Sequence, residues 1–231
     1  MTAYPGIERH LFPIKIREYH KPEDDLNDKL IEFFKTYPQQ PSNLPEGVLT
    51  SRPDLHKCDN EHVKKLHGWF YACLEEYYNE YQLYCDGLEI SLSWFNHAPA
   101  GSGVGHPLHR HPMSYVSAVY YLTEGAPTAF EDPVTPRVYD TLDVFQHEAM
   151  VNEWGINETI TPEPGKLIIF PAWLRHYSDR QLDNFDRWSM SFNAFPVGKV
   201  NVGPWDMPQF CLLYTSPSPR DVEECRMPSS A

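Results

Sequence analysis

From residue 88 onward, short segments with the hydrophobic pattern of β-strands follow one another along the chain. Between Leu88 and Trp94 every second residue is hydrophobic, and a period of two places one row of side chains on one face of a strand. Further strand-like segments, separated by glycine and proline turns, occur at residues 115–122, 129–131, 142–151, 166–170 and 187–195. We therefore predict a mainly β core at residues 88–210, built as a jelly-roll-like pair of sheets.

The preceding part of the chain has a helical period instead. A helix is predicted to begin after Asp59 or Asn60, either of which would cap it, and to be stopped by Gly87. Its hydrophobic stripe, which we interpret as core packing, consists of Val63, Leu66, Phe70, Cys73, Leu74, Tyr77 and Tyr81. Residues 1–87 are therefore expected to form helical and loop elements that support the β core.

Three shorter elements are predicted within this support region. Hydrophobic residues alternate over residues 12–17, which indicates a strand. A second helix is expected between Pro22 and Pro38. Residues 37–53 are rich in proline, serine and asparagine and are predicted to form a long loop.

The last 21 residues do not resemble natural protein sequence. Residues 211–221 (CLLYTSPSPRD) and 226–231 (RMPSSA) match the two ends of a translated transposon-end sequencing adapter, in the right order. The four residues between them fall where a variable index would stand. We interpret residues 211–231 as a translated adapter, and expect the native C-terminus to be missing beyond about Phe210.

Composition excludes several classes of function. The net charge is −13, and the chain has no run of lysine or arginine, which argues against binding nucleic acid through its phosphates. No apolar run reaches the roughly 20 residues of a membrane span, and the N-terminus lacks the pattern of a signal peptide. The five cysteines have no CxxC spacing, so we expect neither a zinc ribbon nor a disulfide framework, and a cytoplasmic location.

The strongest candidate for chemistry is the pair His109 and His111. In an extended segment residues i and i+2 point to the same face, so the two imidazoles are able to converge on one point. His176 follows the predicted strand at residues 166–170 and supplies a remote third imidazole. Three neutral ligands on one side of a metal ion leave positions open for other molecules.

A second candidate lies eleven residues after His176. On the predicted strand at residues 187–195, Arg187 and Ser189 share one face with Ser191 and Asn193. The residues between them, Trp188, Met190 and Phe192, are expected to pack on the other face. A guanidinium that faces a protein interior is costly unless it meets an anion, and its planar fork suits a carboxylate. An ordinary ion pair at a sheet edge is the alternative for Arg187.

No function is assigned to the remaining histidines. Surface positions are expected for His10, His20, His56, His62 and His67. His97 and His106 precede the cluster in a predicted loop and are expected to be exposed, although either is near enough in sequence to orient it. His147, beside Glu148, is expected at or near the surface of a strand.

Several of these motifs together resemble a known family. They are residues 93–96 (SWFN), 109–112 (HRHP), 117–122 (SAVYYL), 132–133 (DP), 165–176 and 187–193. They are similar to a branch of the 2-oxoglutarate/Fe(II) oxygenases that is related to the prolyl hydroxylases and frequent in marine bacterial and phage sequences. The similarity covers about residues 88–195 and implies a double-stranded β-helix, the jelly-roll fold that is also found in cupins.

The resemblance implies a metal site and a reaction. His109, His111 and His176 would bind Fe(II), with no further catalytic residue. The cosubstrates would be 2-oxoglutarate and O₂. The implied reaction is hydroxylation of a small-molecule or peptidyl substrate, with release of succinate and CO₂.

The resemblance also implies a cosubstrate site. Arg187, with Ser189, would hold the distal carboxylate of 2-oxoglutarate. Tyr121 stands where the prolyl-hydroxylase pattern has a cosubstrate-binding tyrosine, and its neighbour Tyr120 would face the other way. Asn96 is a weaker candidate for a polar group near the cosubstrate.

Two departures from the family pattern leave other interpretations open. Most of the superfamily has an aspartate where this chain has His111, and Asp132-Pro133 is followed by Val134 in place of the arginine that is frequent in this branch. One alternative is a three-histidine, cupin-type dioxygenase or isomerase that does not use 2-oxoglutarate. The other is a non-catalytic, ligand-binding jelly roll. The Arg187/Ser189 pair favours the oxygenase, whereas loop composition specifies neither the substrate nor the oligomeric state.

Overall fold

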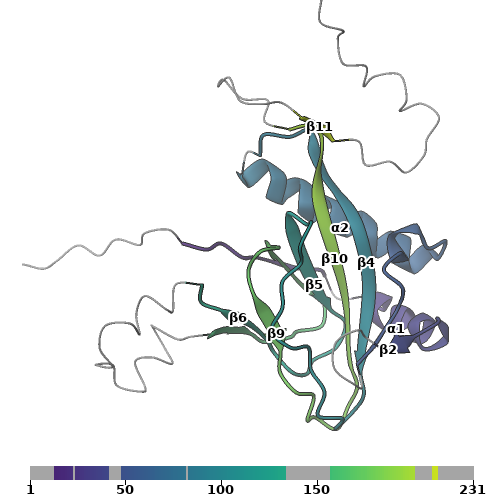
Figure 1. Cartoon of the computed structure of the whole chain (residues 1–231). Coiled ribbons are helices and arrows are strands. Elements are labelled where there is room, and N and C mark those ends of the chain that lie inside the picture. Colours follow the sequence, from purple (N-terminus) through teal and green to yellow (C-terminus); the bar gives the residue numbers. More distant parts are fainter. Residues whose placement is uncertain are drawn as a thin grey trace, which may run out of the picture.

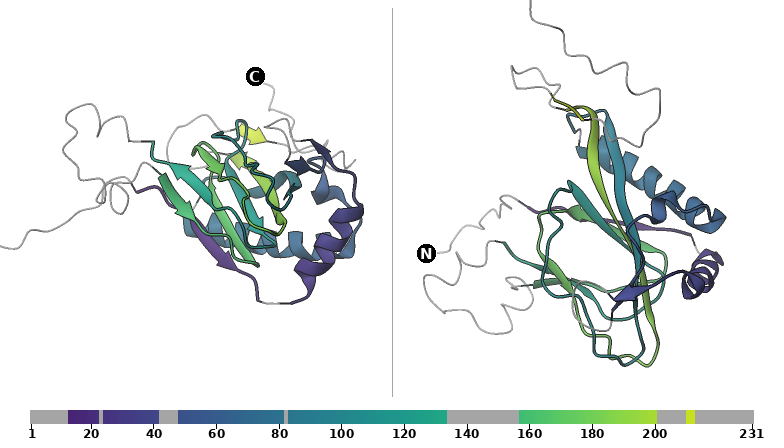
Figure 2. Two further views of the ribbon diagram at one scale, coloured as in Figure 1. Left: turned by 90° about the horizontal axis from the view of Figure 1, so that it is seen from below. Right: turned by 45° about the vertical axis from the view of Figure 1, so that its right-hand side comes forward.

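The computed structural model describes residues 13–22, 24–41, 48–81, 83–133 and 157–200, and the backbone of residues 210–212. Two antiparallel sheets face each other within this part of the chain (Figures 1 and 2). The predicted strand at residues 142–151 and all but two residues of the predicted adapter lie outside the described residues. Those two, Cys211 and Leu212, belong to a short terminal strand.

The larger sheet contains the long central strands. Its order is β1 (Arg17–His20), β8 (Lys166–Pro171), β5 (Val116–Tyr121), β10 (Arg187–Val200), β4 (Gly87–Ala98), β3 (Leu49–Thr50) and β2 (Gln40–Pro41). In addition, β11 (Phe210–Leu212) pairs with the outer end of β10. The smaller sheet has the order β7 (Asn157–Ile160), β6 (Thr128–Glu131) and β9 (His176–Ser178).

Helices α1 (Leu26–Thr36) and α2 (Glu61–Tyr81) cover one face of the larger sheet, and the smaller sheet lies on the other side (Figures 1 and 2). A short 3₁₀ helix, η1 (Leu55–Lys57), precedes α2. The apolar faces of both helices form the main core with Phe95, Tyr120 and Phe192 of the sheet. The predicted mainly β fold with helical support, a double-stranded β-helix, is therefore confirmed.

A second, smaller core lies between the two sheets. It joins Tyr121, Ile168 and Phe170 of the larger sheet to Phe130 and Ile160 of the smaller one. Because one strand contributes to both cores, its neighbouring residues point to opposite sides: Tyr121 belongs to the core between the sheets, and Tyr120 to the core under the helices. This packing joins the two sheets.

The start of α2 agrees with one of the two predicted caps. The Asn60 side-chain oxygen accepts hydrogen bonds from the backbone N–H groups of His62 and Val63, at 2.9 and 3.1 Å. The prediction for the other end is wrong, because the helix ends at Tyr81 and Gly87 is the first residue of β4. Asp86 N–H already bonds to Val197 O in the turn that leads into this strand.

Two other local predictions need correction. The strand predicted over residues 12–17 begins only at Arg17, because the hydrogen-bonded ladder with β8 runs from Arg17 opposite Ile169 to His20 opposite Lys166. The predicted loop at residues 37–53 contains the two-residue strands β2 and β3. Within the described ranges, no helix is long and apolar enough to cross a membrane.

Candidate metal centre

A cavity of about 430 Å³ opens between the two sheets. Side chains on one face of β4 and β10 form the floor of the cavity. Strand β9 and the segment that precedes β5 form the opposite side. The lining includes the three histidines of the predicted metal site, together with Asn96, Arg187, Ser189, Ser191 and Asn193. Sequence positions almost 100 residues apart therefore meet in one cavity.

His109 and His111 lie on an extended segment that is bonded to the chain around His176. The backbone N–H of His109 donates to His176 O, and the N–H of His176 donates back to His109 O, both at 2.9 Å. His111 N–H donates to Ala172 O at 3.0 Å. This segment forms only an isolated bridge and not a full strand, but its extended geometry gives the two histidines a common direction.

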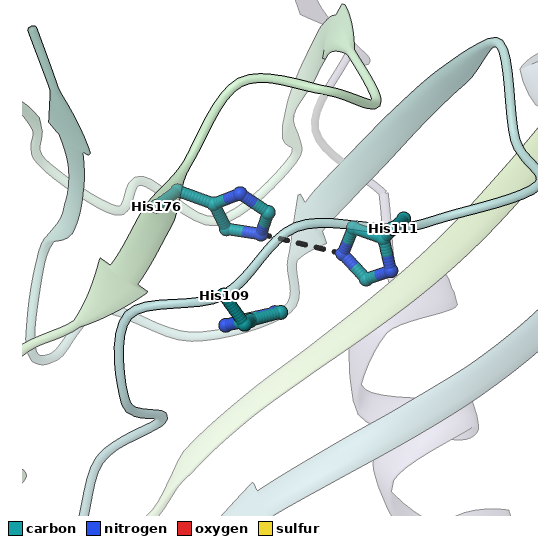
Figure 3. A group of neighbouring side chains, drawn as sticks. All are labelled: His109, His111 and His176. Atoms are coloured by element: carbon teal, nitrogen blue, oxygen red, sulfur yellow. Dashed lines mark hydrogen bonds between the residues drawn. The ribbon is translucent and has the colours of Figure 1, made fainter. Parts of the chain in front are cut away.

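The three imidazoles converge. One ring nitrogen from each of His109, His111 and His176 lies within 4.8 Å of the other two. His111 Nε2 and His176 Nε2 are 3.3 Å apart (Figure 3). The ring centroids of His109 and His176 are 4.3 Å apart. Three nitrogen atoms at these separations fit around a single metal ion, because metal–imidazole bonds are about 2.0–2.1 Å long.

Backbone carbonyls orient two of the three rings. His109 Nδ1 donates to Pro107 O at 2.7 Å, and His176 Nδ1 donates to Leu174 O at 3.0 Å. A carbonyl only accepts, so the proton of each neutral ring is on Nδ1 and the lone pair is on Nε2. Such partners are what keeps metal-binding imidazoles in the ligating tautomer.

The surroundings keep these rings neutral. Burial, and the neighbouring histidines, lower the pKa of His111 to about 3 and that of His176 to about 4. Burial also lowers the pKa of His109. At neutral pH each of the three rings is therefore neutral and has one nitrogen lone pair, as metal binding requires. A set of three imidazoles suits iron, zinc, copper or nickel, and not the oxygen-seeking ions calcium and magnesium.

Arg187 lies in the same cavity and is almost fully buried, with 5% of its surface exposed. Its Nε donates to Ala126 O at 3.0 Å, and its guanidinium carbon is 5.8 Å from the centre of the Tyr121 ring. Burial lowers the pKa of this guanidinium. The described part of the chain provides no carboxylate partner for it. The cavity therefore contains a buried cation suited to an anionic ligand.

The faces of β10 agree with the sequence prediction. Arg187, Ser189, Ser191 and Asn193 line the cavity, whereas Trp188, Met190 and Phe192 pack in the core under the helices.

Tyr121 and Asn96 occupy different positions relative to the cavity. Asn96 lines it and donates through Nδ2 to Ser191 Oγ at 3.3 Å. Tyr121 is fully buried behind the wall and donates to Thr128 Oγ1 at 2.8 Å. Thr128 lines the cavity, so Tyr121 is linked to the cavity through its hydrogen bond to Thr128.

Five histidines differ from the sequence expectation of exposure: His56 and His62 are half-buried, and the other three lie closer to the core or the cavity. His67 is buried on α2, where Nδ1 bonds to Val63 O at 2.9 Å and Nε2 contacts Ser93 Oγ at 3.1 Å. His97 is half-buried on β4 and stacks on Trp188, with ring centroids 3.9 Å apart. His106 is half-buried and lines the cavity.

The burial of His67, His97 and His106 has identifiable causes. His67 lies one position beyond Leu66 in the helical stripe, and His97 occupies the same side of β4 as Phe95. The sequence pattern therefore contained a signal for burial at both positions. His106 is held by a bond from its own N–H to Ser178 Oγ at 2.8 Å, a contact between segments 72 residues apart. No local pattern indicates such a contact.

Comparisons with known proteins agree with the expected resemblance. Residues 92–193 match the model of a family described as "Putative 2OG-Fe(II) oxygenase". The resemblance to this family is therefore confirmed, and the family description names the two expected cofactors, Fe(II) and 2-oxoglutarate. No curated protein sequence matches the chain.

Solved structures share the fold at low sequence identity. A prolyl-4-hydroxylase from Pseudomonas putida is 15% identical, with a TM-score of 0.56 over 80% of this chain and 94% of that one. The epimerase SnoN from nogalamycin biosynthesis, in complex with Fe³⁺, alpha ketoglutarate (2-oxoglutarate) and nogalamycin RO, is 12% identical, with a TM-score of 0.60 over 88% and 92%.

A third structure is HygX from Streptomyces hygroscopicus with nickel, 2-oxoglutarate and hygromycin B bound. It is 11% identical, with a TM-score of 0.54 over 79% of this chain and 83% of that one. Together, the family match and the shared fold support a 2OG-Fe(II) oxygenase.

Proposed function

From the family match over residues 92–193, we propose that this chain is an Fe(II)- and 2-oxoglutarate-dependent oxygenase that hydroxylates a small-molecule or peptidyl substrate. His109, His111 and His176 bind the iron. Arg187 and Ser189 bind the distal carboxylate of 2-oxoglutarate, and O₂ is the second cosubstrate. A small-molecule substrate is supported by the fold relatives solved with hygromycin B and with nogalamycin RO.

One observation carries this proposal: the buried Arg187, which no carboxylate of the described residues pairs with, shares a cavity with three converging neutral imidazoles. A buried guanidinium beside a metal site calls for an anionic ligand, and 2-oxoglutarate is one. A dicarboxylate explains both features, because one end chelates a metal while the other end neutralises an arginine. The Ser189 hydroxyl, on the same face of β10, adds a donor for the second carboxylate.

The ligand set favours an anionic chelator. Because all three side chains are neutral, a divalent ion bound by them would keep its full charge of +2. An aspartate at the position of His111 would have reduced that charge by one. The chain therefore leaves more positive charge for the carboxylate of the cosubstrate to neutralise, which changes the affinity and redox behaviour of the metal.

When bound, the iron and its cosubstrate supply the oxidising power for attack on a C–H bond. The residues of the chain provide binding and orientation. Carbonyl groups hold His109 and His176 in the ligating tautomer. Asn96 and Ser191, bonded to each other, form part of the cavity floor between Arg187 and the histidines. Tyr121 fixes Thr128 on the opposite wall.

The proposal is tested with the metal-stripped, 231-residue chain. Fe(II) and then 2-oxoglutarate are added without oxygen, and the absorption spectrum is followed for a metal-to-ligand charge-transfer band. We expect a band only when both are present, and we expect it to be lost in His176→Ala. His20→Ala, at an exposed position on β1, is the control and should retain the band.

Two other results would favour the two alternatives. Folded, iron-loaded protein without a band would indicate a three-histidine enzyme that uses something other than 2-oxoglutarate. Folded protein that binds no metal would indicate a non-catalytic jelly roll. If the band forms, succinate release in the presence of O₂ and candidate substrates then distinguishes hydroxylation from other oxidative outcomes.

A further inference from the structure

The third histidine of the cluster differs from the other two in what orients it. His109 and His176 donate to backbone carbonyls, whereas His111 Nδ1 faces the side-chain carboxamide of Asn193, at 3.4 Å from Nδ2. A carbonyl fixes one tautomer of an imidazole. A carboxamide fixes neither, because one end donates and the other end accepts.

Asn193 is held firmly in this position. It is 4% exposed, and its Oδ1 accepts a hydrogen bond of 2.8 Å from Ser117 Oγ on the neighbouring strand β5. Ser117 itself is 1% exposed. On its other side, Asn193 pairs with Leu92 of β4 and Ala194 pairs with Ile90, so β4 has one extra residue, Ser91, opposite this point.

The observed bonds imply one particular tautomer of His111. His176 carries its proton on Nδ1, so its Nε2 only accepts. The 3.3 Å contact between the two Nε2 atoms is a hydrogen bond when the proton of His111 is on Nε2, which agrees with the Asn193 donor that faces Nδ1. His111 Nδ1 then accepts from Asn193 Nδ2, and Asn193 Oδ1 accepts from Ser117. Every donor in this arrangement has an acceptor, but His111 Nε2 has no lone pair for a metal.

We propose that Asn193 is a positioning residue whose carboxamide turns over to bring His111 into its ligating form. In the turned arrangement, Asn193 Oδ1 accepts from a protonated His111 Nδ1, and Nδ2 donates to Ser117 Oγ. The serine hydroxyl accepts as readily as it donates. The imidazole exchanges one proton with solvent between its two nitrogens, so its charge does not change. This inference rests on the proposed function, because it takes His111 as an iron ligand.

The test compares two substitutions of Asn193 in the full chain. Asn193→Asp replaces the carboxamide with two acceptors, and Asn193→Leu has similar size but no hydrogen-bonding group. Asn27→Leu is the matched control, since Asn27 also bonds through both ends of its carboxamide, to Leu122 O and the Tyr120 hydroxyl, away from the cavity. Zn(II) affinity is measured against a competing chelator, and the tautomer of His111 is read from ¹⁵N chemical shifts in the Zn(II) complex.

We expect Asn193→Leu to weaken Zn(II) binding by roughly 10–100-fold, the usual effect of losing a partner that orients a metal ligand. Asn193→Asp should bind within a few-fold of the wild type or more tightly, because a carboxylate accepts from Nδ1. In the wild type, His111 Nδ1 should carry the proton in the Zn(II) complex. Asn27→Leu should bind Zn(II) as the wild type does.

Three results would overturn the inference. They are unchanged Zn(II) affinity in Asn193→Leu, an equal loss in the Asp and Leu variants, and an unprotonated His111 Nδ1 in the wild-type complex. The last measurement needs no variant, so it decides the matter even if the Leu variant does not fold. A folded wild-type chain that binds no Zn(II) or Fe(II) would instead remove the proposed function itself.

Discussion

Arg187 carries a buried charge that no carboxylate of the described residues balances. Charge-assisted hydrogen bonds contribute about 1.5–3 kcal/mol. We therefore expect Arg187→Leu to raise the dissociation constant for 2-oxoglutarate by roughly 10–100-fold while metal binding is retained. Isothermal titration of the metal-loaded protein measures both. Arg180→Leu, at an exposed position, should change neither. Equal 2-oxoglutarate affinity in Arg187→Leu and the wild type would remove the role assigned to this residue.

His67 makes folding stability depend on pH. Burial lowers its pKa from 6.5 to about 4. Between these values the unfolded chain binds a proton that the folded chain does not, so the free energy of unfolding falls as pH decreases from about 6.5 toward about 4. The full effect is on the order of 3 kcal/mol.

His67→Gln should therefore reduce this pH dependence, measured by urea unfolding at several pH values with metal removed. His20→Gln serves as the control, since His20 is exposed on β1. The explanation fails if the His67→Gln protein loses stability between pH 6.5 and 4 as steeply as the wild type.

For individual residues, the sequence predicted which side chains point to the same face of an extended segment. The HxH spacing placed His109 and His111 on one side, and the alternation of β10 separated Arg187 and Ser189 from Trp188. It did not predict the environment of a single residue such as His106, because burial there depends on Ser178, which is distant in the chain. Asn193 was placed on the correct face, but its contact with His111 emerged only from the folded chain.

At the scale of elements, α2 begins at a specific cap. Asn60 accepts two backbone hydrogen bonds, whereas the neighbouring Asp59 is exposed and pairs with Lys64. Asn60→Ala should therefore lower the free energy of unfolding by about 1 kcal/mol, and Asp59→Ala by much less, because exposed ion pairs contribute little. Urea unfolding of both variants provides the comparison. Equal decreases in the free energy of unfolding for the two variants would mean that the Asn60 cap does not specifically stabilise the helix.

The turn that contains Gly125 and Ala126 positions the Arg187 side chain. Gln181 Oε1 accepts from Ala126 N–H at 3.0 Å, and Ala126 O accepts from Arg187. Gly125 has φ of +136°, and a Cβ there would lie 2.8 Å from Gln181 Oε1 and 3.1 Å from the Arg187 side chain. Neither the dihedral angle nor the space suits another residue.

Gly125→Ala is therefore expected to destabilise the fold by about 1–3 kcal/mol and to weaken 2-oxoglutarate binding through displacement of Arg187. Gly68→Ala on α2, where an added Cβ meets nothing within 4 Å, should be neutral or stabilising. Thermal unfolding and 2-oxoglutarate titration check both variants. Tight cosubstrate binding by Gly125→Ala would show that the turn does not control Arg187.

The stripe of α2 extends over several turns and was predicted well. The alternation predicted for β4 is wrong beyond Ile90, because Ser91 is an extra residue in the pairing with β10. Leu92 and Trp94 line the cavity, whereas Leu88 and Ile90 pack under the helices. Strands β2 and β3 have two residues each and exist only because β4 provides a partner. The start of β1 is likewise set by β8, and no property of residues 12–17 alone determines it.

On the scale of the whole molecule, the two bound cofactors would connect parts of the chain that share few backbone bonds. His176 belongs to the smaller sheet, whereas Arg187 and Ser189 belong to the larger one. Metal and 2-oxoglutarate together should therefore stabilise the fold as one unit. At concentrations 100-fold above the dissociation constant, binding adds about 2.7 kcal/mol, which for a chain of this size raises Tm by roughly 5–10 °C.

Differential scanning fluorimetry tests this expectation with Zn(II) alone, 2-oxoglutarate alone and both together. In Arg187→Leu, Zn(II) alone should still raise Tm, but the addition of 2-oxoglutarate should give no further increase in Tm. A Tm that rises equally with 2-oxoglutarate in the presence and absence of metal would contradict binding at the shared cavity.

A β-bulge on β4, whose extra residue Ser91 lies opposite Asn193 and Ala194, divides β10 into two parts with different tolerance to evolutionary change. Before the bulge, one inserted residue would turn Arg187 from the cavity to the helix-covered core, so the spacing from Arg187 to Asn193 is under strict constraint. After the bulge, the strand pairs with β4 in a shifted register and leads away from the cavity. Insertions and deletions among natural relatives should therefore accumulate beyond Ala194, where β10 no longer lines the cavity.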